Sequence, residues 1–254
     1  MRHLIIIIII LTTLNKVTNA QEIVTDRPDQ TESTTTVPNK TIQIEMGFGN
    51  ENYNGEKLSL LPTALFRYGL SKKIELRFVE QLTAFNENTL SEKEFGLSDI
   101  ELGLKLQVFK KEDINTEIAF ISHLIVPTGS SELTNANYGT INKLAISHVL
   151  TNYLDLGYNL GYNYLGTGNG DLTYSLVLGI GLAKNMGMYV ETFGEYSDFT
   201  EITSNFDSGF TYLLKENLQL DFSMGLGLNQ KMNYFSCGFS WNINCMHHKE
   251  TVDI

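Results

Sequence analysis

Residues 153–165 read YLDLGYNLGYNYL, with a large apolar side chain at every second position from Leu154 to Tyr164. Successive side chains of a β-strand point to opposite faces. One face of this stretch is therefore aliphatic and aromatic, whereas the other carries aspartate, asparagine and glycine. About ten residues is also the length that a tilted strand needs to cross a bilayer. The stretch predicts a membrane-spanning strand with one face toward lipid and the other toward a wet interior.

Similar segments recur along the chain and bring the number of candidate strands to twelve. Aliphatic residues alternate with glycine and polar residues most clearly in Ile100–Val108, Leu172–Leu182 and Leu218–Leu228. The segment at Gly187–Tyr196 is ambiguous, because its two faces are poorly separated. The eleven segments besides the first are Ile42–Gly49, Leu60–Leu70, Ile74–Leu82, Ile100–Val108, Thr116–Val126, Thr140–Leu150, Leu172–Leu182, Gly187–Tyr196, Phe206–Leu214, Leu218–Leu228 and Tyr234–Ile243.

The connections between these segments alternate between short turns and longer loops, as in outer-membrane barrels. The short turns include Ser71–Lys73 and Thr151–Asn152, and the longer loops are expected at Asn50–Lys57, Thr83–Ser98, Pro127–Tyr138 and Ser197–Asn205. An open sheet in lipid would leave its edge amides unsatisfied, so the sheet must close. The sequence predicts an all-β, transmembrane, antiparallel up-and-down β-barrel of about 12 strands over residues 41–243, with both termini periplasmic. A soluble β-sandwich or lipocalin-like barrel is the competing interpretation.

The two ends of the chain differ in composition from the barrel. Residues 1–20 resemble a secretory signal peptide, with Arg2 and His3 before the aliphatic run Leu4–Leu11 and a cleavage point after Ala20. Its removal takes away Arg2 and Lys16 and changes the net charge from −11 to −13. This charge argues against nucleic acid as a partner. Residues 21–40 form a polar leader, either an extended linker or a segment within the lumen, and residues 244–254 form a C-terminal tail.

Charged residues on the inward parity of the strands are candidates for lining a solute path. The five that we select by strand parity are Arg67, Glu75, Arg77, Glu101 and Lys105. Acids outnumber bases among all inward positions, so an open lumen would modestly favour cations. The alternative is that these charges pair across a narrow barrel and only brace it, since twelve strands lie between filled and open barrels in size.

The sequence gives weak support for catalysis, a metal or a cofactor. The neighbouring pairs Ser122-His123 and Ser147-His148 point to opposite faces of a strand, and neither can form a dyad by itself. Cys245, His247 and His248 lie in a polar tail and are interpreted as ordinary chain and not as a metal site. We therefore expect no catalytic residue, no metal and no cofactor, and we interpret Cys237 as a small outward-facing residue.

Three short motifs together suggest a family. They are TDRPDQTES at Thr25–Ser33, RYGL at Arg67–Leu70 followed by IELR at Ile74–Arg77, and VPTG at Val126–Gly129. In this order the mature chain resembles the bacterial outer-membrane transporter family called "MetA-pathway of phenol degradation". The resemblance implies a barrel that passes small, often hydrophobic or aromatic, compounds. It also implies that the leader residues Asp26, Arg27, Pro28 and Asp29 enter the lumen as a plug or latch. The tail after Asn244 departs from barrels that end on an aromatic residue.

These observations predict a passive outer-membrane channel or transporter for small solutes. Its expected partners are outer-membrane lipid, an unidentified small solute and the barrel-assembly machinery. One alternative is a structural or surface-interaction barrel with a filled lumen. A membrane hydrolase is a third and weaker alternative.

Overall fold

A computed structural model describes residues 23–85, 94–111 and 113–244. The predicted signal peptide and residues 245–254 of the predicted C-terminal tail lie outside these residues, as do Cys245, His247 and His248, whereas Asn244 belongs to the last strand and not to a tail. Within the described ranges no helix has both the length and the apolar character needed to cross a membrane. The ordered secondary structure in them is β-strand throughout.

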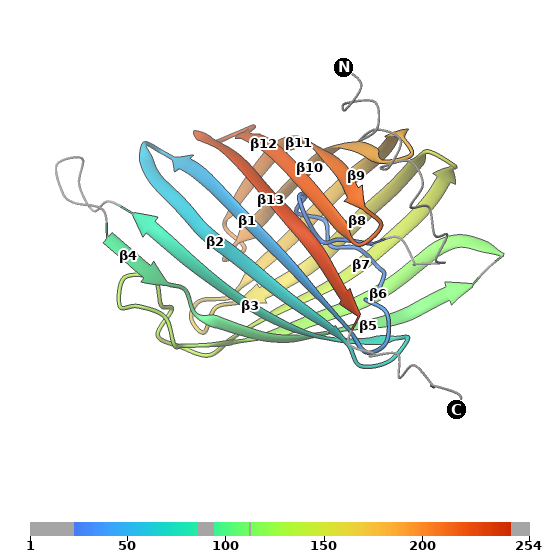
Figure 1. Ribbon diagram of the computed structural model, residues 1–254. Coiled ribbons are helices and arrows are strands. Elements are labelled where there is room, and N and C mark those ends of the chain that lie inside the picture. The colour runs from blue at the N-terminus through green and yellow to red at the C-terminus, as the bar shows by residue number, and fades with distance from the viewer. Residues whose placement is uncertain (1–22, 86–93, 112, 245–254) are drawn as a thin grey trace, which may run out of the picture.

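The strands form one closed antiparallel sheet (Figure 1). Apart from β4 and β5, strands that follow one another in the chain pair with each other, and β1 closes the barrel against β13 from Thr41↔Asn244 to Tyr53↔Met232. The short β4 continues β5 after a break at Ser98–Asp99, because both pair with β3. The barrel therefore has the twelve strand positions that the sequence predicts. The bounds are β1 Thr41–Tyr53, β2 Glu56–Gly69, β3 Ile74–Phe85, β4 Glu94–Leu97, β5 Ile100–Lys111, β6 Ile114–Val126, β7 Gly139–Thr151, β8 Leu154–Tyr164, β9 Asp171–Ala183, β10 Met186–Ser197, β11 Glu201–Lys215, β12 Leu218–Gly227 and β13 Met232–Asn244.

The outer surface of the barrel is aliphatic and aromatic. In β8, Leu160 is 56% exposed, whereas its neighbour Asn159 is 4% exposed inside the barrel. The same division holds on β12, where Phe222 and Met224 are exposed and Ser223 is buried. Alternation at period two thus places apolar side chains outside, where only lipid can cover so large an apolar surface.

The connections differ in one respect from the expectation. Loops were predicted at Asn50–Lys57 and Ser197–Asn205, but the strands continue through most of both segments. β1 and β2 are joined by Asn54 and Gly55 alone, with φ of 53° and 99°. An Asn-Gly pair with positive φ forms the tight hairpin turn that matches the twist of long strands. Residues 127–138 connect β6 and β7 and remain a long loop at this end.

The interior is less uniformly small and polar than the alternation predicts. Leu65 pairs with the buried Glu45 and with Val79, which places both apolar residues on the inward face. Ile121, paired with Lys105, is fully buried inside, as are Ala119 and Ala145 on β6 and β7. The interior wall from β2 to β7 therefore mixes apolar side chains with charged ones.

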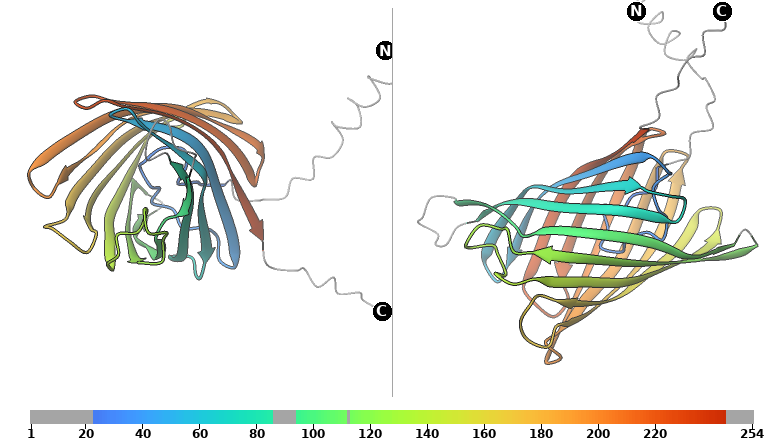
Figure 2. Two further views of the ribbon diagram at one scale, coloured as in Figure 1. Left: turned by 90° about the vertical axis from the view of Figure 1, so that its left-hand side faces the viewer. Right: turned by 90° about the horizontal axis from the view of Figure 1, so that it is seen from below.

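The leader, residues 23–40, runs inside the barrel before it turns into β1. Figures 1 and 2 show it as the blue coil enclosed by the strands. At its end, the Lys40 amide donates to the Gly69 carbonyl at 2.7 Å, and Pro38 approaches the same glycine closely. A Cβ at Gly69 would lie 2.1 Å from the Pro38 oxygen, so this contact requires glycine. The leader is thereby fixed to the end of the barrel where the short turns lie.

Candidate solute-binding lumen

Asp26 of the leader is the centre of a buried cluster of bases. Its carboxylate accepts from Arg77 Nη1 at 2.7 Å and from Lys105 Nζ at 2.8 Å, and Arg67 Nη1 lies 3.4 Å away. The three bases come from β3, β5 and β2. Burial acts to raise the pKa of Asp26, but the charges of Arg67, Lys105 and Arg77 outweigh it and hold that pKa well below its usual value. Asp26 is therefore ionised and ties the leader to three strands.

Two of the bases around Asp26, Arg67 and Arg77, also pair with acids of the wall. Arg67 donates from Nε to Glu75 Oε1 at 2.8 Å and from Nη1 to Glu45 Oε1 at 2.8 Å. Arg67, Glu75 and Lys105 are at most 1% exposed. A buried charge network of this kind holds when each member is paired, because one uncompensated charge is costly.

Arg77 and Glu101 also contact His123 on β6. Arg77 Nε donates to His123 Nε2 at 3.0 Å, and His123 Nδ1 lies 2.6 Å from Glu101 Oε2. The Arg77 bond requires an unprotonated Nε2, so the geometry places the ring proton on Nδ1, toward Glu101. His123 is thus a bridge between two strands. Of the serines considered for a dyad, Ser122 donates to Asn142, and Ser147 shares a hydrogen bond with Thr34.

Arg27 points to the opposite wall. Its Nη2 donates to Asp221 Oδ1 on β12 at 2.9 Å and to Ser236 Oγ on β13 at 3.1 Å. The guanidinium lies over two glycines: a Cβ at Gly47 would come within 2.0 Å of Nη1, and one at Gly238 within 2.7 Å of Nη2. Small residues on the inner face of β1 and β13 therefore leave the space in which Arg27 reaches Asp221.

Glu32 anchors the middle of the leader. Arg77 Nη2 donates to its Oε2 at 2.7 Å, and Lys143 Nζ on β7 donates to its Oε1 at 2.8 Å. Burial acts to raise the pKa of Glu32, but Arg77 and Lys143 overcome this and lower it strongly. The backbone of Glu32 is held separately, since its amide and carbonyl both bond the side chain of Asn159 at 2.7 and 3.1 Å.

A second set of acids meets the leader on β10 and β11. Glu191 and Asp207 are direct cross-strand partners, and Glu191 accepts from the Gln30 amide at 2.7 Å and from the Thr31 hydroxyl. Burial and the neighbouring carboxylate of Glu191 raise the pKa of Asp29 well above its usual value. The leader therefore lies between a wall rich in bases, β2 to β7, and a wall rich in acids, β10 to β12.

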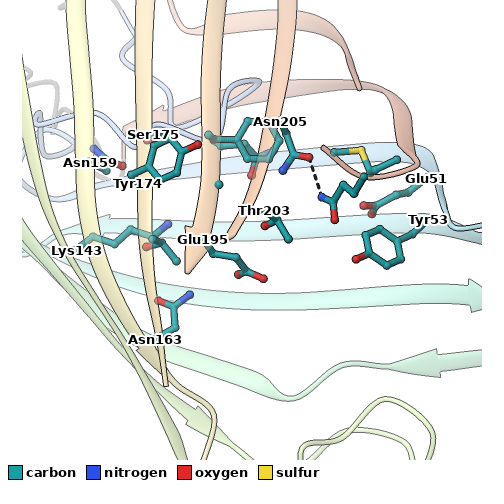
Figure 3. A pocket seen from close by; sticks show the side chains of 16 residues that line it. Glu51, Tyr53, Lys143, Asn159, Asn163, Tyr174, Ser175, Glu195, Thr203 and Asn205 are labelled. Atoms are coloured by element: carbon teal, nitrogen blue, oxygen red, sulfur yellow. Dashed lines mark hydrogen bonds between the residues drawn. The ribbon is translucent and has the colours of Figure 1, made fainter. Parts of the chain in front are cut away.

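Two cavities remain beside the leader. The first has a volume of about 400 Å³ and is lined mainly by polar residues of β7 to β11, among them Asn163, Tyr174 and Glu195 (Figure 3). The second, of about 500 Å³, is bordered by leader residues and by both Arg77 and Lys143. Its wall also includes Leu60, Leu65, Val79, Ile141, Phe193 and Met232. Cavities of this size accommodate a small organic molecule.

The structure places all five selected lumen residues on the inward face, where four of them contact the leader or one another and Glu101 contacts His123. Arg77 and Glu101 border the second cavity, whereas Arg67, Glu75 and Lys105 are covered. Pro28 and Asp29 also border that cavity. That these residues line a solute path stays a prediction. Lys143 and Glu32 were not selected, although strand parity places Lys143 on the inward face and Glu32 is one of the acids of the leader. Within the described ranges, no three His, Cys, Asp or Glu side chains are placed to bind a metal.

Comparisons with known proteins point to one family and one fold. The model of the family described as "Putative MetA-pathway of phenol degradation" matches residues 25–241, a span that begins within the leader. No curated protein sequence matches the chain. The COG4313 outer membrane channel from Pseudomonas putida F1 is similar over 83% of this chain and 98% of its own, with 14% identity and a TM-score of 0.62. The KdgM porin in complex with oligogalacturonate covers 78% of this chain and 98% of its own, with 11% identity and a TM-score of 0.58.

Proposed function

The chain belongs to the family described as "Putative MetA-pathway of phenol degradation", and we propose that it is a passive outer-membrane channel for small solutes. The observation that carries the proposal is the composition of the interior. A separate segment, the leader, lies between opposite walls of the lumen, and beside it lie cavities of about 400 and 500 Å³. A barrel whose role is only structural would be expected to fill this space with side chains of its own strands.

The apolar residues of the second cavity support apolar or aromatic solutes. Leu65, Val79 and Phe193 border it, within reach of the polar groups of the leader. Apolar walls with a few polar groups are typical of sites for small organic ligands. The fold of the relatives, which are a channel and a porin, supports transport without catalysis.

The orientation is part of the same proposal. The turns between β7 and β8 and between β9 and β10 are two residues long, and the leader enters at this end. Outer-membrane barrels place short turns in the periplasm and longer loops outside. Both ends of the barrel, Thr41 and Asn244, would then face the periplasm after insertion by the barrel-assembly machinery.

The proposal can be tested by locking the leader reversibly. Thr31 Oγ1 lies 2.7 Å from Ser175 Oγ, so Thr31→Cys with Ser175→Cys places two thiols side by side. The variant would carry Cys237→Ser and Cys245→Ser to remove the native thiols. Swelling of protein-containing liposomes in a size series of uncharged polar solutes measures the flux.

We expect flux that is low in the oxidised variant and rises on reduction of the same sample. The background variant without the new cysteines is the matched control, and reduction should leave its flux unchanged. Protein verified as folded by its heat-shifted gel mobility that passes no solute in either state would support the alternative, a structural barrel with a filled lumen.

A further inference from the structure

The Glu32 side chain is held differently from the rest of the leader. Its carboxylate bonds one base through each oxygen, Arg77 at 2.7 Å and Lys143 at 2.8 Å. Its backbone is fixed by Asn159 alone and does not depend on those two ion pairs. The carboxylate can therefore leave Arg77 and Lys143 by rotation of its side chain while the main chain of the leader stays in place.

The position of this ion pair in the lumen is also distinctive. Asp26 is enclosed, with its side chain 2% exposed, but the side chains of Glu32 and Lys143 are 11% and 23% exposed. Glu32, Arg77 and Lys143 all border the second cavity, and Lys143 borders the first as well. Figure 3 shows Lys143 and Asn159 among the residues of the first cavity. Lys143 and Glu32 thus face the space that a solute would occupy, and Arg77, whose side chain is 2% exposed, lies behind the Glu32 carboxylate.

Apolar side chains surround the same space. Leu65 and Val79 are partners on β2 and β3, and Val79 is two residues from Arg77 on the same face. Ile141 stands two residues before Lys143, and Phe193 also borders both cavities. A molecule with one carboxylate and an apolar body would therefore meet two basic side chains and an apolar wall within one cavity.

We propose that Arg77 and Lys143 form a subsite for the carboxylate of an apolar or aromatic carboxylic acid, and that Glu32 occupies this subsite when no solute is bound. The inference rests on the proposed function, because the solute must enter the lumen. Exchange of one carboxylate for another keeps both bases paired, and the displaced Glu32 carboxylate turns toward the cavity that it already borders. Nearby acids do not block the exchange: Glu101 is engaged by His123, and Asp26 by three bases.

Removal of the competing carboxylate should strengthen solute binding. A subsite that Glu32 leaves free for a tenth of the time or less would bind a solute about tenfold more weakly, or worse, than a vacant one. The variant is Glu32→Ala in the full mature chain, and the probes are benzoate, benzyl alcohol and acetate. Isothermal titration calorimetry on the refolded, solubilised barrel measures affinity without any need for conduction.

Benzoate should bind Glu32→Ala about tenfold or more tightly than the wild type. Benzyl alcohol, which has the ring without the charge, should show no such gain, and acetate, which has the charge without the ring, should bind more weakly than benzoate. The double variant Glu32→Ala/Lys143→Met should lose the gain. Equal affinity of Glu32→Ala and wild type for benzoate, or an equal gain for benzyl alcohol, would overturn the proposal, and acetate equal to benzoate would overturn its apolar part.

A second variant covers failure of Glu32→Ala to fold. Lys143→Met retains Glu32 and Arg77, and it should lower the affinity of the native barrel for benzoate at least several-fold if the subsite exists; an unchanged affinity contradicts it. The two proposals fail separately. A barrel that binds benzoate but passes no solute refutes the channel, whereas a conducting barrel in which Glu32→Ala gains no affinity refutes the subsite.

Discussion

Substitution of Asp26 by asparagine removes the charge on which three bases of the wall converge. Arg77 and Lys105 lose partners at 2.7 and 2.8 Å, and Arg67 loses a contact at 3.4 Å. Removal of one partner from a buried ion pair costs about 3–5 kcal/mol, because the remaining charge is uncompensated. Glu45 and Glu75 still pair with Arg67, and Glu75 with Arg77, whereas Lys105 keeps a contact with Ser33 Oγ at 3.4 Å, so we take about 3 kcal/mol as the smallest expected cost.

The loss should appear in the docking of the leader, since Asp26 belongs to it. A change of about 3 kcal/mol corresponds to roughly a hundredfold increase in the population with a released leader. Thr34, 4% exposed, can be replaced by cysteine in a Cys237→Ser/Cys245→Ser background. The rate at which this cysteine reacts with a soluble maleimide then measures how often the leader is released.

We expect Asp26→Asn to raise the labelling rate by about two orders of magnitude. Asp29→Asn is the matched control: it is the same chemical change three residues away, but it removes a like-charge contact with Glu191. Its labelling rate should stay the same or fall. An unchanged rate in Asp26→Asn, or an equal increase in both variants, would refute the role of Asp26 as the anchor.

Three further predictions follow from single contacts. The raised pKa of Asp29 means that its contribution to docking is complete below the ordinary value of 3.8 and is lost as the pH rises through the raised pKa. Labelling of Thr34→Cys should therefore accelerate in the wild type as the pH rises from 3.8 through the raised pKa, but less in Asp29→Asn; parallel profiles would contradict this. Asp26 and Glu32 have lowered pKa values and hold the leader above their ordinary range, so docking should also weaken in strong acid, as the same labelling would show. Gly69→Ala should lower the free energy of unfolding by about 1–3 kcal/mol, because the added Cβ would clash with Pro38. Gly179→Ala, whose added Cβ would have its nearest neighbour at 3.9 Å, should not lower it. Equal melting curves for the two variants would count against the leader geometry.

Much of the barrel could be predicted from the sequence, because one physical rule governs all its strands. Lipid outside and water inside impose alternation with period two, and β8 shows this from Leu154 to Tyr164. The same rule gave the closed sheet of twelve strand positions. It assigns Arg67 of β2 correctly to the inside, but it does not distinguish the two faces from Leu60 to Phe66, where apolar residues stand at both parities around Pro62. There the pairing with β3 shifts register between Leu60 and Thr63, and parity cannot assign faces across a bulge.

The lumen was less predictable, because its contacts join segments that are far apart in the chain. Parity indicates that Arg67, Arg77 and Lys105 point inward, but it does not show that Asp26 lies between them. The leader has no regular alternation of apolar and polar residues, so its path depends on charges contributed by many strands. Lys143 and Glu32, which are 111 residues apart, illustrate the point. The length of the loops was overestimated for a local reason, since Asn54 and Gly55 turn the chain in two residues.

The central claim is that this barrel is a channel with a leader inside its lumen. Single-channel conductance in a planar bilayer tests it most directly, on the refolded mature protein and on a variant that lacks residues 21–40, each verified as folded by heat-shifted gel mobility. The account predicts discrete conductance steps that become larger, or lose their closures, when the leader is absent. A bilayer that stays silent with both proteins, or steps of equal size and gating in the two, would contradict it.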